Sequence, residues 1–320
     1  MFKVTYPLNN RHIQTLYAPF FRKQRKKLLF QIEHFELYDK DFVECYWHNQ
    51  KPKDNQPIVI LFHGLAGSFK SPYILGLMRA LEKKGFASVL MHFRGCSGKP
   101  NLLPRSYHSG DTADARAWIN YLKVKYKESL LHAVGYSIGG NMLLKLLGED
   151  GSKTPLKSAI SVSAPMDLDI TAKRINQGFS KRYQKHLLNP LKETLLQKYQ
   201  QFNMQKLINQ SQEDIKNIQT IEEFDEKYTA PINGFKSAED YYKKCSAKQF
   251  LKNIKIPTLI IHALDDPFMT PKILPTQEEL SEYVQLNISK HGGHVGFVNG
   301  TIFRPKYWLE ERIVRYLMEQ

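Results

Sequence analysis

The chain has 320 residues, enough to bury a large core, and its apolar fraction of 42% and aromatic fraction of 12% exclude a disordered protein. Its longest uninterrupted apolar run, Ile58–Phe62, is far shorter than the roughly 20 residues that cross a bilayer. The first residues, MFKVTYPLNNRHIQ, contain no apolar signal core, and three widely spaced cysteines make neither a disulfide framework nor a paired-cysteine metal site. We therefore expect a cytoplasmic protein.

The charge is strongly positive, because 46 Lys and Arg residues outnumber 31 Asp and Glu residues and give a net charge of +15. One basic cluster, RKQRKK at residues 22–27, has the composition that meets phosphates on nucleic acid or on anionic lipid. The cluster is short and no nucleic-acid-binding motif accompanies it. We expect a solvated lysine-rich surface and no nucleic-acid partner, and we leave open a weak, salt-sensitive contact with anionic membranes.

The predicted elements begin with an antiparallel hairpin over residues 35–47 that turns at Asp39-Lys40-Asp41. Beyond it, short apolar strands alternate with amphipathic helices, which predicts a mostly parallel, doubly wound α/β sheet covered on both faces. The predicted strands are Ile58–Phe62, Phe86–Phe93, Leu130–Gly135, Ala159–Pro165, Pro257–Leu264 and Val284–Ile288. The predicted helices run from Pro72 to near Gly85, from Asp111 to about Tyr126, over Ile138–Leu147 with an end near Gly148, and over Lys306–Met318.

The alternation of strands and helices breaks between about Met166 and Leu251. This stretch is polar, rich in Lys, Gln and Tyr, and mainly helical in its periodicity. Because it lies between two predicted strands of one sheet, we interpret residues 166–251 as a helical cap inserted into a single domain that spans residues 1–320.

The sequence VGYSIGG at residues 134–140 contains a G-x-S-x-G motif between a predicted strand and a predicted helix. In this setting the chain turns sharply and exposes the serine at the top of the sheet, which makes Ser137 the candidate nucleophile. Side chains at Gly135, Gly139 or Gly140 would collide across such a turn. The glycines therefore make room for the exposed hydroxyl.

A serine hydroxyl needs a base to take its proton and an acid to orient that base, and in this fold class they follow in the order Ser, Asp, His. Two acids and two histidines stand at suitable places. Asp266, which abuts a proline, is preferred to Asp265, and His294, which follows two flexible glycines, is preferred to His291. A metal site at the two histidines lacks a convincing third ligand.

The oxyanion of the reaction needs two backbone N–H donors. We expect one from Ile138, which follows the nucleophile, and one from Leu65 in the loop after the Ile58–Phe62 strand. We predict substrate contacts for His63, Tyr136 and Phe179, although His63 has as its alternative a structural role in orienting its loop. The aromatic residues of the cap could line an acyl channel or simply pack its helices together: Phe179, Tyr183, Phe224, Tyr228 and Phe235.

No cofactor is expected. RGCSGKP at residues 94–100 imitates part of a phosphate-binding loop, but Phe93 stands where the first glycine is required and Pro100 where Ser or Thr is required. No G-x-G-x-x-G follows a strand, so the sequence predicts no dinucleotide site.

Over nearly its whole length the chain resembles the α/β-hydrolase superfamily and, within it, the YheT-like branch of carboxylesterases and lipases. The segments that carry this resemblance are RHIQTLY, HGLAGSFKSPY, FRGCSGKPNLLPRSYHSGDTAD, GYSIGGN, EEFDEKYTAPINGFKSAEDYYKKCSA, DDPF and HGGHVGF. The resemblance implies triad roles for Ser137, Asp266 and His294. The chain departs from the branch at residues 39–41, where the family often has a glycine.

These features predict a serine hydrolase that cleaves carboxylic esters through an acyl-enzyme on Ser137. The resemblance implies short- or medium-chain acyl esters, including esters derived from glycerolipids. One alternative is acyl transfer to an alcohol by the same triad. Another is a non-catalytic module that binds a lipid or a partner. None of these functions predicts an oligomeric state.

Overall fold

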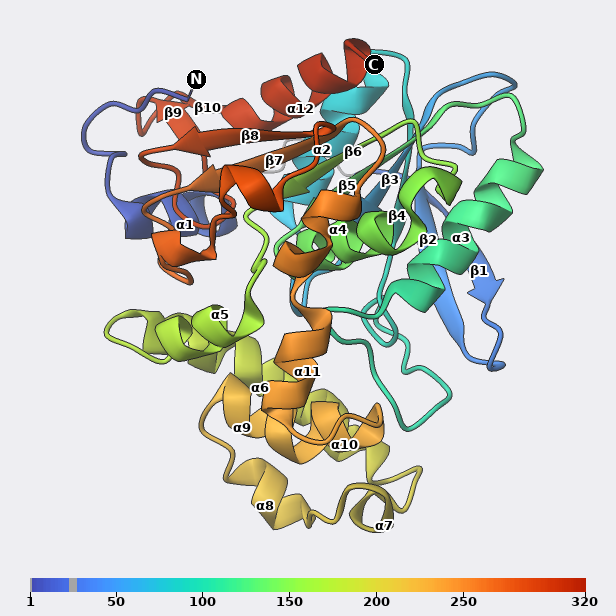
Figure 1. The fold of residues 1–320 in the computed structure, drawn as a ribbon, viewed down its shortest axis with the longest axis vertical. Coiled ribbons are helices and arrows are strands. Elements are labelled where there is room, and N and C mark those ends of the chain that lie inside the picture. The colour runs from blue at the N-terminus through green and yellow to red at the C-terminus, as the bar shows by residue number, and fades with distance from the viewer. Residues whose placement is uncertain (1, 23–27) are drawn as a thin grey trace.

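The structure is a computed structural model that describes residues 2–22 and 28–320. Its centre is an eight-stranded sheet in the order β1-β2-β4-β3-β5-β6-β7-β8 (Figure 1). Strands β1 and β2 pair antiparallel, β2 joins β4 antiparallel, and the remaining neighbours are parallel. The strands are β1 (Phe30–Glu36), β2 (Phe42–His48), β3 (Ile58–Phe62), β4 (Ala87–Met91), β5 (Leu131–Tyr136), β6 (Ser158–Val162), β7 (Thr258–Ala263) and β8 (Val284–Ser289).

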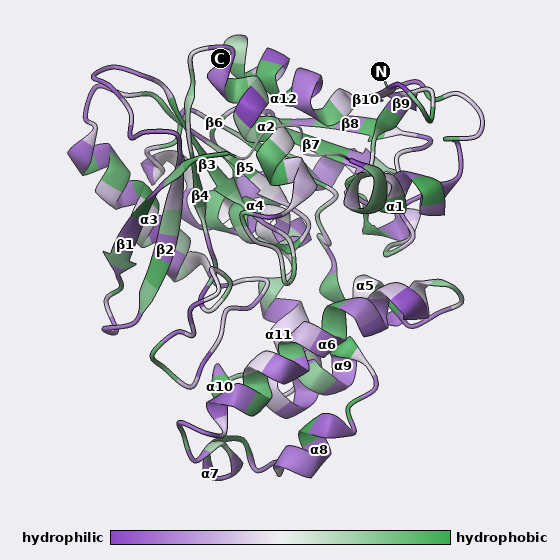
Figure 2. Ribbon diagram, turned by 180° about the vertical axis from the view of Figure 1, so that it is seen from behind, coloured by the Kyte–Doolittle hydropathy of each residue, from purple (hydrophilic) through white to green (hydrophobic). Residues whose placement is uncertain are grey.

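Alternate residues of the buried strands pack against helices on opposite faces, as expected for a doubly wound sheet. Ile60 belongs to the core that contains α3 (Thr112–Lys125) and α4 (Ile138–Asp150). Its neighbour Val59 belongs to the core that contains α2 (Pro72–Glu82) and α12 (Trp308–Met318). In Figure 2 the central strands carry the hydrophobic colour, whereas the helices carry both colours. The predicted fold class is confirmed.

The turn between β1 and β2 does more than reverse the chain. Asp39 and Asp41 each accept a hydrogen bond from Arg94 Nη1, at 2.8 and 2.9 Å, and Asp114 accepts from Arg94 Nε at 2.6 Å. The Arg94 side chain is fully buried. The two aspartates at this turn therefore neutralise a buried arginine in the loop after β4.

Between β6 and β7 the chain forms a group of helices that lies at the opposite end of the molecule from the two chain termini (Figure 1). They pack around apolar clusters that are separate from the two cores of the sheet. We propose that they constitute the cap predicted over residues 166–251. The helices are α5 (Leu168–Ile175), α6 (Ser180–Lys198), α7 (Met204–Ile208), α8 (Gln212–Lys216), α9 (Ile221–Phe224), α10 (Ala230–Ile232) and α11 (Ala238–Cys245).

Two further elements support the site. Helix α1 (Arg11–Phe21) precedes the hairpin, and a ribbon of β9 (Val298–Gly300) and β10 (Pro305–Tyr307) follows β8. Among residues 2–22 and 28–320, no helix has the length and apolar character needed to cross a membrane.

Candidate active site

Ser137 occupies the tight turn between β5 and α4, with φ 52° and ψ −121°. A positive φ is strained for a residue with a side chain, and such strain is typical of exposed nucleophiles. A Cβ added to Gly135 would lie 2.3 Å from the Gly139 carbonyl oxygen, and one added to Gly139 would lie 2.5 Å from the His63 carbonyl oxygen. The glycines around Ser137 therefore allow backbone segments to approach as closely as the turn requires.

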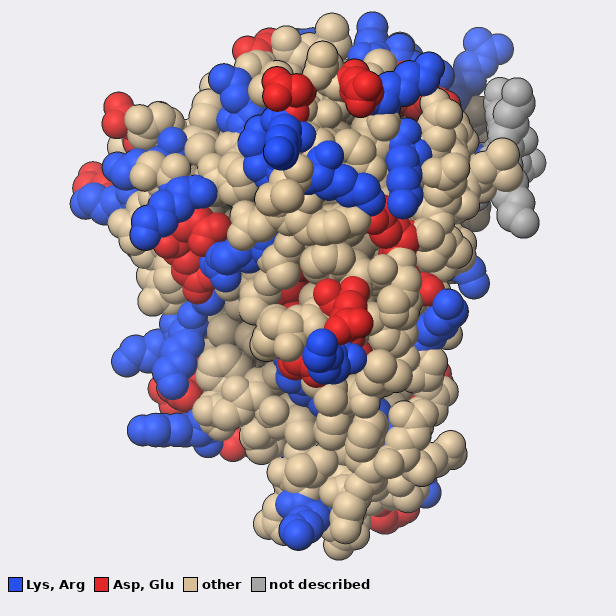
Figure 3. Space-filling view, turned by 90° about the vertical axis from the view of Figure 1, so that its right-hand side faces the viewer, with Lys and Arg blue, Asp and Glu red and all other residues tan. Residues whose placement is uncertain are grey.

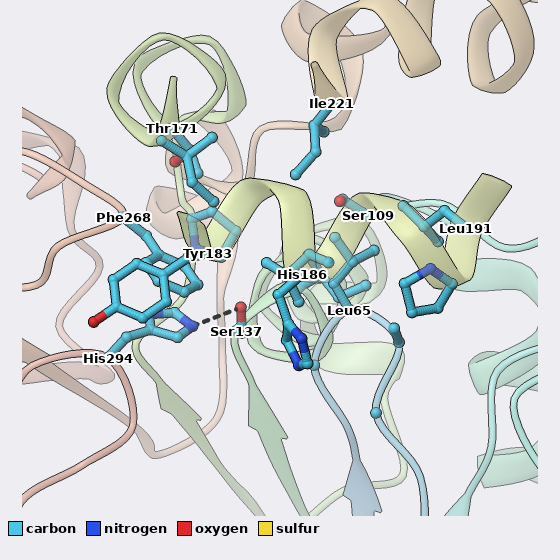
Figure 4. Close-up of a pocket in the computed structure, with 18 of the residues that line it drawn as sticks. Leu65, Ser109, Ser137, Thr171, Tyr183, His186, Leu191, Ile221, Phe268 and His294 are labelled. Atoms are coloured by element: carbon cyan, nitrogen blue, oxygen red, sulfur yellow. Dashed lines mark hydrogen bonds between the residues drawn. The ribbon is translucent and has the colours of Figure 1, made fainter. Parts of the chain in front are cut away.

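The structure brings Ser137, His294 and Asp266 into one hydrogen-bonded chain, and Figure 4 shows its link between His294 and Ser137. His294 Nε2 lies 3.1 Å from Ser137 Oγ, and His294 Nδ1 lies 2.8 Å from Asp266 Oδ2. Asp266 is almost fully buried, and its other carboxylate oxygen accepts the Phe268 N–H at 2.8 Å. With Nδ1–H donated to the carboxylate, Nε2 is left to accept the hydroxyl proton.

The two residues that were weighed against Asp266 and His294 form a separate pair. His291 Nδ1 lies 3.2 Å from Asp265 Oδ2, and Asp265 Oδ1 accepts the Gly293 N–H at 2.9 Å. Asp265 thus fixes the loop that carries His294. The two histidines pair with different carboxylates rather than with one shared ligand set.

Helix α1 and an aromatic ring also hold His294, and sequence reasoning assigned no role to either. Thr15 Oγ1 accepts the His294 N–H at 3.0 Å, and Gln14 exchanges two hydrogen bonds of 2.7 Å with the backbone of Val298. The Phe268 ring stacks on the imidazole with a centroid separation of 4.1 Å. Gln14 and Thr15 belong to the segment RHIQTLY, so the resemblance was the one available signal.

Leu65 and Ile138 both border the cavity that contains Ser137. Within the described part of the chain, neither backbone N–H donates a hydrogen bond to the protein. Free N–H groups next to a nucleophile are what an oxyanion requires. The placement is consistent with the predicted role of both residues.

The cavity has a volume of about 860 Å³ and lies between the carboxyl ends of the strands and the cap. In Figure 4, Thr171 and Ile221 of the cap face Ser137 across it. Its walls are mainly apolar, with contributions from α1, the loop after β3 and cap helices. Of the aromatic cap residues singled out from the sequence, four line it: Phe179, Tyr183, Phe224 and Tyr228.

His63 and Tyr136 are buried and do not line this cavity, so we revise their predicted substrate contacts to a positioning role. His63 Nδ1–H donates to the Gly64 carbonyl at 2.7 Å, and Nε2 accepts the Phe93 N–H at 3.1 Å. Burial lowers the pKa of His63 to about 3, which keeps the ring neutral and suited to this pair of bonds. Tyr136 packs against the Tyr73 ring, with a centroid separation of 4.5 Å.

Comparison with known proteins agrees with this geometry. Residues 57–301 match the family model described as "alpha/beta hydrolase fold". The chain is 44% identical over 310 residues to the Escherichia coli (strain K12) protein named "Putative esterase YheT", an alignment that covers 97% of this chain and 90% of that protein. It is 29% identical over 283 residues to the monoacylglycerol lipase of Saccharomyces cerevisiae, covering 85% of this chain and 62% of that protein.

A solved structure supports the fold. The Pyrococcus furiosus esterase Pf2001 matches with a TM-score of 0.60 and 17% identity, over 92% of this chain and 91% of that chain. At this identity the likeness concerns the fold alone. Taken with the family match and the esterase and lipase relatives, the fold and site show that the chain belongs to the alpha/beta hydrolase family and is a hydrolytic enzyme of the esterase type.

Proposed function

We propose that the protein hydrolyses carboxylic esters through an acyl-enzyme on Ser137. The observation that carries the proposal is the hydrogen-bonded series from Ser137 Oγ through His294 to buried Asp266. A nucleophile, a general base and an orienting carboxylate in this order are the groups that acyl transfer needs.

In the first half-reaction, His294 Nε2 takes the Ser137 proton as Oγ attacks the ester carbon. The Leu65 and Ile138 N–H groups stabilise the resulting oxyanion. His294 then gives its proton to the departing alcohol, which leaves an acyl-enzyme. In the second half-reaction His294 takes a proton from water, the hydroxide attacks the acyl carbon, and the proton returns to Ser137, while Asp266 stabilises the imidazolium in both halves.

The cavity supports an acyl ester of small or medium size as substrate. Its volume of about 860 Å³ lies within the usual range for small-molecule sites, and its mainly apolar wall suits a hydrocarbon chain. Phe179 borders it and is our candidate for substrate contact. The similarity to the yeast monoacylglycerol lipase supports acyl chains esterified to glycerol as substrates of this protein.

The test is a series of p-nitrophenyl esters of increasing acyl length, assayed with the wild type and with Ser137→Ala. We expect activity in the wild type that peaks at a short or medium chain, and a loss of about 10⁴-fold or more in the variant. Activity that survives in Ser137→Ala would overturn the acyl-enzyme. Failure of a fluorophosphonate probe to label wild-type Ser137 would favour the non-catalytic module.

Acyl transfer and hydrolysis share every step up to the acyl-enzyme, so product analysis separates them. We expect free acid to remain the main product when glycerol or ethanol is added. A new ester as the main product would replace hydrolysis by acyl transfer as the proposed reaction.

We also propose a peripheral contact between the mouth of the cavity and anionic membranes. Phe20 is 73% exposed and borders the cavity, Phe21 is 67% exposed, and Phe303 is 94% exposed. Tyr17 lies beside Phe21 and donates a hydrogen bond to the carbonyl of Ile302, so the exposed aromatics of α1 and of the 301–304 turn are neighbours. Exposed aromatics on a cationic protein suit an anionic interface.

The basic cluster at residues 22–27 contributes little evidence to this contact. Arg22 pairs with Glu310, and residues 23–27 lie outside the described residues. On the face shown in Figure 3, Lys and Arg side chains stand among Asp and Glu side chains rather than in one basic stripe. Sedimentation with phosphatidylglycerol vesicles tests the contact: we expect binding that weakens with salt and with Phe303→Ser, and binding absent or indifferent to salt would overturn it.

A further inference from the structure

The backbone N–H groups on either side of Leu65 are each bonded to a tyrosine hydroxyl. The Gly64 N–H donates to Tyr73 Oη at 3.0 Å, and the Ala66 N–H donates to Tyr107 Oη at 3.0 Å. Between them the Leu65 N–H has no hydrogen-bond partner in the described residues and borders the cavity of Ser137. Two fixed amides therefore flank one free amide.

We propose that Tyr73 and Tyr107 are positioning residues that hold the Leu65 N–H in the orientation needed to stabilise the oxyanion. The inference rests on the proposed function, because an oxyanion forms at this place only if Ser137 attacks an ester. It gives a role to two residues of the segments HGLAGSFKSPY and FRGCSGKPNLLPRSYHSGDTAD that the triad leaves unexplained.

The loop needs such support because its own backbone bonds fix it incompletely. The backbone closes this turn with one bond, from the Gly67 N–H to the Gly64 carbonyl at 2.9 Å, among the described residues. The N–H groups of residues 64–66 donate to no backbone acceptor in the described structure. Ala66 has φ 52°, a strained value for a residue with a side chain. A peptide plane in such a turn can rotate unless its N–H is held, and rotation would point the Leu65 N–H away from the oxyanion.

Both tyrosine rings are themselves fixed by stacking or packing. Tyr107 stacks on Phe93 with a centroid separation of 5.0 Å and an interplanar angle of 13°. Tyr73 packs on Tyr136, the residue immediately before the nucleophile. Burial raises the pKa of both phenols, so each remains a neutral hydroxyl whose oxygen can accept the amide bond. The Tyr73–Tyr136 contact links the oxyanion loop to the turn that carries Ser137.

The test replaces each tyrosine with phenylalanine, which keeps the ring and removes only the hydroxyl. We expect Tyr73→Phe and Tyr107→Phe each to lower kcat about tenfold with KM nearly unchanged, because loss of an oxyanion donor itself lowers kcat about 10²- to 10³-fold and misorientation does less. Tyr199→Phe is the matched control, since its hydroxyl donates to the Gln210 carbonyl at 2.7 Å in the cap. It should leave kcat unchanged.

A second readout reports on the oxyanion directly. Ser137 Oγ adds to the carbonyl carbon of a trifluoromethyl ketone, the serine proton passes to His294, and the ketone oxygen becomes an oxyanion. The affinity of the enzyme for the ketone should fall in the same proportion as kcat in the two variants. Its affinity for the matching alcohol, which forms no oxyanion, should not change. Circular dichroism gives the fraction of folded protein in each sample. Because kcat and the two affinities are calculated from the concentration of folded protein, partial unfolding of a variant does not change the comparison.

The two levels of the proposal fail in different ways. If a fluorophosphonate does not label wild-type Ser137, the proposed function fails. If labelling is normal but both variants keep wild-type kcat and trifluoromethyl ketone affinity, the inference about the tyrosines fails alone. Equal weakening of the ketone and the alcohol would also overturn it, because a distorted cavity rather than a misplaced donor would then be the cause.

Discussion

The carboxyl edge of the sheet and the cap enclose the same cavity, but they are built differently. Strands β3 to β7 are buried along their whole length, and the residues of the proposed triad lie in tight turns at or beyond the ends of strands β5, β7 and β8. The cap helices instead pack around smaller clusters of their own. The larger of these clusters consists of the buried residues Leu188, Leu195, Met204, Ile208, Ile215, Ile218, Phe224 and Tyr228.

Hydrogen bonds to one segment of the sheet domain, residues 101–109, help to hold the cap in place. Lys198 Nζ donates to Asn101 Oδ1 and to the Leu103 carbonyl, each at 2.7 Å. Tyr228 Oη donates to the Pro104 carbonyl at 2.9 Å, and a second cap tyrosine accepts the Ser109 N–H. Each such bond contributes about 1 kcal/mol net, less than a large buried side chain, so we expect the cap to open locally before the sheet does.

The largest effect should appear on the sheet side, at the acid of the proposed triad. Asp266→Asn should lower kcat about 10⁴-fold, because the amide no longer holds the imidazole in the tautomer that accepts the Ser137 proton. Asp265→Asn should lower it far less, since Asp265 supports the loop and His291 rather than the relay. The measurement is kcat on a short p-nitrophenyl ester, with melting temperature as the control. An equal loss in both variants would contradict our assignment of the acid.

A pair of buried isoleucines compares the stability of the two regions. Ile215 in the cap and Ile313 in α12 are both fully buried, and truncation to alanine should cost about 2–5 kcal/mol in each case. We expect Ile215→Ala to speed hydrogen exchange in α5 to α11 and to leave β3 to β7 unchanged. Ile313→Ala should speed exchange throughout the sheet. Uniform acceleration in both variants would show that cap and sheet open as one unit.

Local sequence patterns predicted strands β3 to β8 to within three residues, because apolar runs and capping residues act over short distances. The predicted hairpin over residues 35–47 missed the start of β1, which begins at Phe30. One helix end was also misplaced: α4 does not end near Gly148 but continues to Asp150, and the next residue, Gly151, has φ 53°. Gly148 is a glycine for another reason, since an added Cβ would lie 2.3 Å from the Phe250 carbonyl oxygen. A close approach between distant segments looks, in sequence, like a helix end.

The residues of the candidate site also divide into those that local sequence predicted and those that only the folded chain brings together. Tight turns with glycine neighbours pointed to Ser137 and His294 from local sequence. The bond from His294 N–H to Thr15 joins residues 279 positions apart, and no local pattern predicts such a contact. The Tyr107 hydroxyl likewise meets Ala66 across 41 positions. The side chains that we propose to react left a local signal, whereas those that we propose to position them required the folded chain.

The smallest effect we predict concerns a carboxyl in the cap. Asp225 borders the cavity and accepts a hydrogen bond from Tyr242 Oη at 2.9 Å, and burial raises its pKa to about 7 from 3.8. The folded protein therefore keeps this proton at pH values where the unfolded chain has lost it. Stability from this group is fully present below about pH 4 and declines as the pH rises to about 7, where the folded state also ionises.

Asp225→Asn removes that dependence on pH. The unfolding free energy of the variant minus that of the wild type should therefore be about 1–2 kcal/mol larger at pH 8 than at pH 4. This is less than the full shift would give at 1.36 kcal/mol per pKa unit, because a carboxyl beside a cavity is partly solvated. Urea unfolding of both proteins at the two pH values measures the difference, and other titrating groups cancel in the comparison. A difference that is constant with pH would mean that Asp225 ionises like a solvated carboxyl, and the cap interior would then be as wet as its polar sequence suggests.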